Sequence, residues 1–275
     1  MAVLTRKQIQ IRNLVQELAK KGAVWRNDAE NKLNKAKRDY EANEDQETIN
    51  DLAEASERIA KSTFIMFIVS TNPTELLPAK GNVVNPATVL VATSKMLTKD
   101  IRHETPKIFH LILNYLNPEL LEQFKKYEMT VGTDVDGNLT TLDIDVYNKL
   151  KQSMLEMVQS ISSLADVREK ITDEMLNDEQ KVSPAISTTE DRKKIKAFAD
   201  KAYLEDVNPS TLASNIWFQA KIFSYWYNHF TRYLDNPKQI DFTKPEYNWF
   251  IREIPFHMDL MEKQITFLKK NIAYK

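Results

Sequence analysis

The chain has 275 residues, of which 42% are hydrophobic and 28% are charged, and its net charge is −1. Near-neutrality gives the whole molecule no general attraction to nucleic acid or acidic membranes, and the lack of cysteine excludes disulfides and thiolate metal sites. Only four glycines occur, and no two have the spacing of a phosphate-binding loop, which argues against Rossmann and P-loop chemistry and favours helices.

No targeting or membrane-spanning segment is predicted. The N-terminal residues lack the apolar run of a signal peptide. The strongest apolar run, residues 64–69, is far shorter than the roughly 20 residues that a membrane helix needs. We therefore expect a protein that is not secreted through a signal peptide and that works in the cytoplasm or within an assembled particle.

Residues 1–70 are predicted to form a helical hairpin arm. Apolar residues recur at helical spacing in two long segments, and the polar stretch from Asn43 to Asp45 separates them. Gly22 marks a potential interruption of the first segment. The sequence thus predicts a long antiparallel hairpin over residues 5–70, with a polar tip and an apolar base that a body anchors.

Proline placement predicts where later helices begin. Most of the ten prolines follow Asn, Ser or Thr, and a small polar residue before proline is typical of a helix N-terminus. Asn85, Thr105, Asn117 and Asn208 precede helix-like patterns in this way.

Residues 71–180 are predicted to form a helical body with one small β-hairpin near 129–144. Asp136-Gly137 is a two-residue hairpin signal, which would place Val131 opposite Leu142. A helix from about 146 to 171 follows. Its apolar residues keep a seven-residue repeat that suits a coiled-coil-like seam, and they are Tyr147, Leu150, Met154, Met157, Ile161, Leu164 and Ile171.

Residues 181–275 are predicted to form an aromatic-rich helical bundle, either separate from residues 71–180 or continuous with them. The helix near 209–234 is apolar on most sides and has one polar stripe, on which Trp217, Lys221 and Asn228 fall. An exposed Trp217 would be a candidate interface anchor. Two helices close the chain, one near 245–253 and one from Pro255.

One partial motif suggests calcium. Asp134, Asp136, Asn138 and Asp145 occupy oxygen-donor positions of a calcium loop, but Leu139 stands where that loop needs glycine. The hairpin explains the same residues more simply, so these four are weak candidates and no metal site is predicted.

The remaining polar candidates favour ordinary structural roles. His103 and His110 are too far apart along the chain, about 10 Å on a helix, to share a zinc ion as zincin histidines do. The charged residues within 6–21 are mostly basic and those within 44–57 are all acidic, which fits solvated helix faces better than phosphate binding. No catalytic residue, cofactor, nucleic-acid partner or membrane partner is predicted.

The sequence as a whole favours an all-α, non-enzymatic structural or adaptor subunit that works through protein–protein assembly, as a homo-oligomer or in a larger complex. A viral or phage particle component, such as a connector or neck protein, would fit. Its predicted interface consists of Trp217, Lys221, Asn228, Tyr147, Leu150, Met154 and Met157. Two alternatives stay open: a membrane-active helical protein that uses residues 62–97, and a calcium-dependent binding protein.

Overall fold

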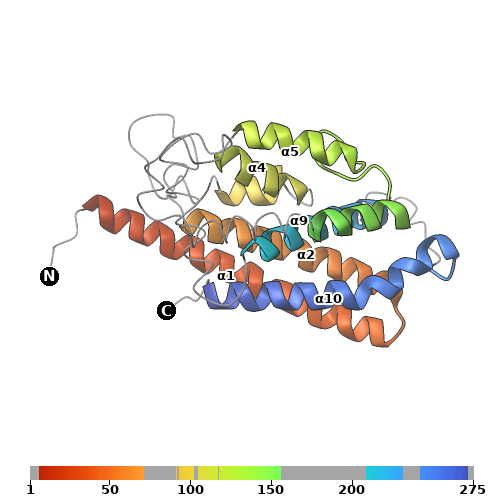
Figure 1. Cartoon of the computed structure of the whole chain (residues 1–275). Helices are drawn as coiled ribbons and strands as arrows, with labels where there is room; N and C mark the ends of the chain where they lie inside the picture. The colour runs from red at the N-terminus through yellow and green to blue at the C-terminus, as the bar shows by residue number, and fades with distance from the viewer. Residues whose placement is uncertain are drawn as a thin grey trace, which may run out of the picture.

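The computed structural model describes residues 6–70, 91, 93–101, 105–116, 118–155, 209–231 and 242–271, and this part of the chain is mostly helical. Its elements are α1 (Arg6–Glu41), α2 (Asp45–Ser70), the short π-helix η1 (Met96–Asp100), α4 (Pro106–Leu116), α5 (Pro118–Thr130), a helix over residues 144–155, α9 (Pro209–Thr231) and α10 (Pro245–Asn271). Figure 1 shows α4 and α5 above α2 and α9, with α1 and α10 below them. The predicted helical fold is confirmed for these residues.

The predicted helix starts at proline agree with the structure wherever it describes them. Pro106, Pro118 and Pro209 are the first residues of α4, α5 and α9. Proline at this position loses no hydrogen bond, because the first amides of a helix have no partner within it. The start predicted at Asn85 lies outside the described residues.

A tight turn joins α1 to α2. Asn43 adopts a left-handed conformation with φ of 58°, and the amide of Glu44 donates to the carbonyl of Asp39 at 2.8 Å. This arrangement is a Schellman cap, in which asparagine can replace the usual glycine. α1 continues through Gly22, whose carbonyl accepts a 2.9 Å hydrogen bond from the hydroxyl of Ser62 on α2. Packing against α2 thus holds α1 together at its weakest position.

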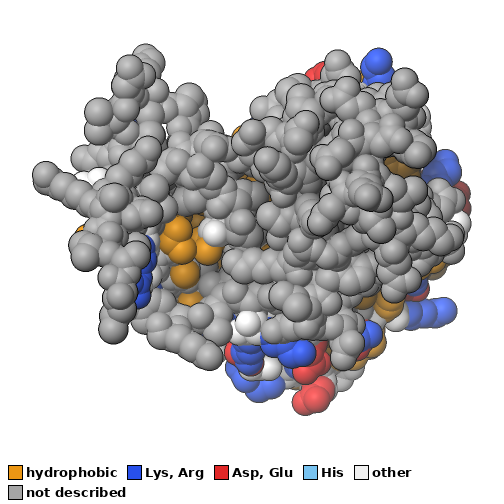
Figure 2. All heavy atoms as spheres, turned by 60° about the vertical axis from the view of Figure 1, so that its left-hand side comes forward, with side chains coloured by type: hydrophobic (Ala, Val, Ile, Leu, Met, Phe, Trp, Pro, Cys, Tyr) orange, Lys and Arg blue, Asp and Glu red, His pale blue; other side chains and the backbone are white. Residues whose placement is uncertain are grey.

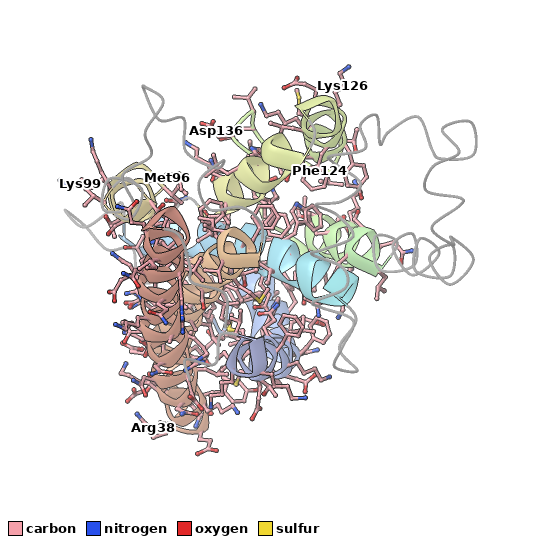
Figure 3. All side chains as sticks on the ribbon, turned by 90° about the vertical axis from the view of Figure 1, so that its left-hand side faces the viewer. Arg38, Met96, Lys99, Phe124, Lys126 and Asp136 are labelled. Atoms are coloured by element: carbon pink, nitrogen blue, oxygen red, sulfur yellow. The ribbon has the colours of Figure 1, made fainter. Side chains whose placement is uncertain are left out.

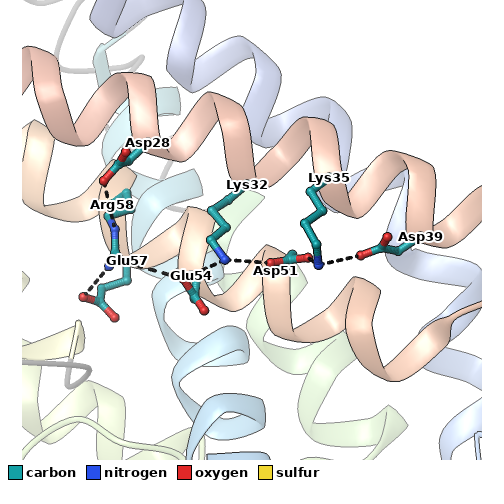
Figure 4. A network of polar contacts seen from close by, with 8 residues as sticks. All are labelled: Asp28, Lys32, Lys35, Asp39, Asp51, Glu54, Glu57 and Arg58. Atoms are coloured by element: carbon teal, nitrogen blue, oxygen red, sulfur yellow. Dashed lines mark hydrogen bonds and ion pairs between the residues drawn. The ribbon is translucent and has the colours of Figure 1, made fainter.

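Ion pairs connect residues 28–35 of α1 to residues 51–58 of α2 (Figure 4). Asp51, only 2% exposed, accepts from Lys32 at 3.0 Å and also from Lys35. Burial alone would raise the pKa of Asp51, but the hydrogen bonds from Lys35 and Lys32 outweigh it and hold the pKa below its usual value. Arg58 adds a 3.8 Å pair with Asp28. These contacts set the register of the two helices, whose facing apolar residues are buried.

The α1–α2 pair is part of the helical body rather than a free arm. α2 packs against both α9 and α10, and α1 also packs against α10. Phe64, Ile65 and Phe67, near the end of α2, are almost completely buried. Their apolar surface is large enough that leaving it in water would cost several kcal/mol, so α2 becomes a central helix.

The two closing helices predicted from the sequence are one helix. α10 runs from Pro245 to Asn271 with Pro255 inside it. An interior proline removes one backbone hydrogen bond and costs about 3 kcal/mol. Here Phe250, Ile254 and Met261 are buried on both sides of Pro255, and their packing outweighs that local cost.

The predicted β-hairpin at 129–144 is not confirmed. Among the described residues this segment has a single antiparallel bridge, between Thr133 and Leu139, in place of two paired strands. The loop comprises residues 135–137, because the amide of Asp134 donates to the carbonyl of Asn138 at 2.8 Å. Gly137 takes the left-handed position that such a turn requires, with φ of 82°. The extra loop residue shifts the register from the predicted one.

The described surface carries both signs of charge close together. Figure 2 shows basic and acidic side chains side by side along the lower edge of the view. None of the described helices combines the length and the apolar character that a bilayer crossing requires.

Candidate functional site

Residues 129–145, called here the acidic segment, form the most unusual surface of the described chain. The segment contains Asp134, Asp136, Asp143 and Asp145 and no basic residue, and all four aspartates are exposed. Figure 3 shows Asp136 at the outer edge of the molecule, near α4 and α5.

The acidic segment also exposes large hydrophobic side chains. Val135, at the tip of the turn, is 70% exposed, and Met129 and Ile144 are 57% and 49% exposed. Single exposed apolar residues are common, and this short segment carries three of them. This surface joins apolar side chains with negative charge.

A buried ionic cluster lies directly beneath the acidic segment. Its centre is Glu128, 1% exposed, at the end of α5. One carboxylate oxygen accepts from His110 Nε2 on α4 at 2.6 Å, and the other accepts from Trp217 Nε1 on α9 at 2.9 Å and from Lys221 Nζ. Because a carboxylate only accepts, Nε2 of His110 carries a proton. Three donors therefore satisfy a carboxylate that burial would otherwise make costly.

The charges of the cluster are strongly coupled. Burial by itself raises the pKa of Glu128, but the hydrogen bond from His110 and the charge of Lys221 outweigh burial, and the net pKa is lowered. Burial lowers the pKa of Lys221, and the attraction of Glu128 and Asp134 offsets only part of that effect. The carboxylate of Glu128 is thus ionised, and the other groups of the cluster are arranged around its negative charge.

The cluster holds the turn in place. Lys221 donates to the carbonyl of Gly137 as well as to Glu128. A Cβ atom on Gly137 would lie 2.7 Å from Lys221 Nζ and 2.9 Å from a ring carbon of His110, so only glycine allows this approach. Lys107 on α4 adds an ion pair to Asp136 at 3.5 Å. The contacts with Lys221 and Lys107 therefore fix the turn conformation that exposes Val135.

Asp134 fixes the same turn from within. Its carboxylate accepts hydrogen bonds from the amides of Asp136 and Asn138 at 2.9 and 2.8 Å, as turn-forming aspartates do. Asp145 lies beyond the turn, in the helix over residues 144–155. Among the calcium-loop residues, Asp134 thus has a turn-forming role here. The described chain holds no group of three or more His, Asp or Glu side chains placed to bind a metal ion.

A second polar network joins the helix over 144–155 to α10. Tyr147 donates to Glu253 at 2.9 Å, and Lys151 donates to the same carboxylate oxygen at 2.8 Å. Burial and the contact with Glu253 raise the pKa of Tyr147 far above its usual value. The hydroxyl of Tyr147 also lies 3.2 Å from Nε2 of His257. Glu253 and Lys151 reach the surface, whereas His257 is fully buried.

His257 is held neutral inside an aromatic shell. Its ring stacks on Phe218 with centroids 5.4 Å apart and meets Phe223 edge-on at 5.0 Å. Since Tyr147 donates to Glu253, Nε2 of His257 must donate to Tyr147, which leaves Nδ1 as an acceptor without a partner. Burial, followed by the charge of Lys151, lowers the pKa of His257 to about 3. This histidine packs as an aromatic ring.

Most of the interface that was predicted on the 146–171 helix and on α9 is buried inside the chain and does not lie on its surface. Trp217, Lys221, Tyr147, Leu150 and Met154 are all buried inside the chain. The polar stripe of α9 faces Glu128 rather than solvent, and the apolar seam faces α9 and α10, because Tyr147 contacts both Phe218 and Trp249. Asn228 is half-buried, and Met157 lies outside the described residues.

Sequence reasoning missed Glu128 and Glu253, and it identified Gly137 only as a turn residue. One available signal was Glu128 itself, which follows Leu121 and Phe124 at helical spacing and therefore occupies an apolar-face position of α5. A charged residue on such a face needs a buried partner. The partner, Lys221, is distant in sequence, so only the fold identifies it.

Comparisons with known protein families, with curated proteins and with solved structures find no match to this chain.

Proposed function

We propose that this chain is a non-enzymatic structural subunit that works by assembling with other protein chains, copies of itself among them. The observation that supports this proposal is the acidic segment, which presents Met129, Val135 and Ile144 to solvent. Exposed apolar side chains rimmed by charge are typical of protein contact surfaces.

The rigid support of this segment favours binding rather than incidental exposure. Glu128, Lys221 and the close approach of Gly137 fix the turn before any partner arrives. A preformed surface loses less conformational entropy on binding than a mobile loop. We propose a cytoplasmic setting or an assembled particle, such as a viral or phage connector or neck, for such a subunit.

The test is the solution mass of the purified chain, measured by light scattering after size exclusion at increasing protein concentration. We expect a mass above that of the 32.0 kDa monomer. The variant Val135→Ser should shift the association to higher concentration, because it removes an exposed apolar side chain from the contact. A mass of 32.0 kDa at every concentration would contradict the proposed self-assembly.

A further inference from the structure

A second exposed surface complements the acidic segment. The outer face of α1, defined here by Ile9, Arg12, Lys20 and Val24, is exposed. At about 100° per residue these four side chains fall within one third of the helix circumference. Ile9 and Val24 are 46% and 59% exposed, so this face also combines apolar side chains with charge.

The two surfaces carry opposite charge. The first part of α1 has an excess of basic residues, which are Arg6, Lys7, Arg12, Lys20, Lys21 and Arg26 against Glu17. The acidic segment has four aspartates and no basic residue. Part of each charge is met within the chain, since Lys20 pairs with Glu17 at 2.6 Å and Asp136 with Lys107 at 3.5 Å. Arg12 and Asp145 add exposed charge of opposite sign on the two surfaces.

The exposed hydrophobic side chains are concentrated on these same surfaces. The described chain exposes seven large hydrophobic residues, which are Ile9, Val24, Val91, Met129, Val135, Ile144 and Leu155. All but Val91 and Leu155 belong to the outer face of α1 or to the acidic segment. Both surfaces therefore have the apolar content that a contact needs and the charge that selects its partner.

One copy of the chain cannot bring the two surfaces together. Figure 1 shows the acidic segment, which follows α5, on the right-hand side and the first part of α1 on the left, with α2 and α9 between them. A contact between the surfaces therefore requires two copies. Because the surfaces lie on opposite sides, the contact is head-to-tail, and repeating it gives a ring or a chain rather than a closed dimer.

We infer that the acidic segment of one copy docks on the outer face of α1 of a second copy. This inference rests on the proposed function, because it names the partner and the two surfaces through which the assembly forms. Electrostatic attraction between them makes association faster and more specific, and added salt weakens it.

Two charge-reversal variants test the contact. Arg12→Glu with Lys20→Glu makes the outer face of α1 acidic, and Asp136→Lys with Asp145→Lys removes the net negative charge of the acidic segment. Neither variant keeps the attraction between two surfaces of opposite charge, so each should remain monomeric at 32.0 kDa where the wild type associates. An equimolar mixture should associate again, because the unchanged acidic segment of the first variant can dock on the unchanged outer face of α1 of the second.

Asp259→Lys with Glu262→Lys is the matched control. It makes the same change of charge as the acidic-segment variant, on exposed positions of α10, so it should associate as the wild type does. Circular dichroism and melting curves verify that each variant is folded.

The outcomes separate this inference from the proposed function. If the wild type associates but the mixture stays monomeric, or if the α10 control loses as much association, the inferred contact is wrong and assembly uses other surfaces. If the wild type is monomeric throughout, both proposals fail. Recovery in the mixture that high salt abolishes supports the contact.

Discussion

Replacing His257 with phenylalanine is expected to flatten the acid side of the stability profile of the protein. His257 is fully buried among aromatic rings, and its pKa falls from an ordinary 6.5 to about 3 in the folded chain. Because the pKa of this histidine is lower in the folded chain than in the unfolded chain, the unfolded chain binds more protons than the folded chain once the pH falls below 6.5. Stability is therefore present above this pH and is lost as the solution becomes acidic.

The magnitude follows from the two pKa values. Between pH 7 and pH 5 the difference between the proton affinities of the two states removes about 2 kcal/mol from the free energy of unfolding. Complete titration, below a pH of about 3, would remove about 5 kcal/mol. The buried position of His257 gives solvent little opportunity to reduce this effect.

The assay is urea unfolding of the wild type and of His257→Phe at several pH values in this window. The quantity compared is the change in the free energy of unfolding with pH, so an altered stability at neutral pH does not affect the result. The variant should lose about 2 kcal/mol less than the wild type on going from pH 7 to pH 5. His257→Gln, which is polar but does not titrate, should behave in the same way. Equal pH dependence of the wild type and both variants would refute the reasoning.

Three further substitutions test the buried cluster and α10. Gly137→Ala should lower the free energy of unfolding by about 1–3 kcal/mol more than Gly132→Ala. Both glycines have positive φ, but only at Gly137 is the position of a Cβ atom blocked, by Lys221 and His110. Equal losses would argue against the close approach of Gly137 to these two side chains. Glu128→Gln leaves Lys221 buried without its counter-charge and should cost about 3–5 kcal/mol in denaturant unfolding, and adding Lys221→Met should recover part of that loss. Pro255→Ala should raise the free energy of unfolding by up to about 3 kcal/mol and should therefore raise the melting temperature. An unchanged melting temperature would mean that α10 is bent to suit proline.

The proposed assembly depends on the same cluster. If Gly137→Ala displaces the turn, the variant should also show weaker association than the one proposed for the wild type, because the exposed position of Val135 depends on that turn. The buried charges therefore connect the stability of the body with the shape of its proposed contact surface.

Local patterns predicted the helices well. Prolines after small polar residues predicted the starts of α4, α5 and α9, and apolar spacing predicted that α1 and α2 are helical. These features depend on hydrogen bonds and side chains within a few residues of one another, so they can be read from the sequence.

Long-range packing decided the rest. Glycine at position 22 and proline at position 255 suggest helix breaks, yet α1 and α10 are continuous through them because of the neighbouring helices that bury their faces.

The sequence by itself determined a cysteine-free helical chain with an acidic turn and an aromatic C-terminal part. Only the tertiary structure decided what the polar residues do. It buried Trp217 and Lys221 against Glu128 and left Val135 exposed above them. The reason is physical: the energy of a buried charge depends on a partner from another helix, and the spacing of residues along one helix does not specify that partner.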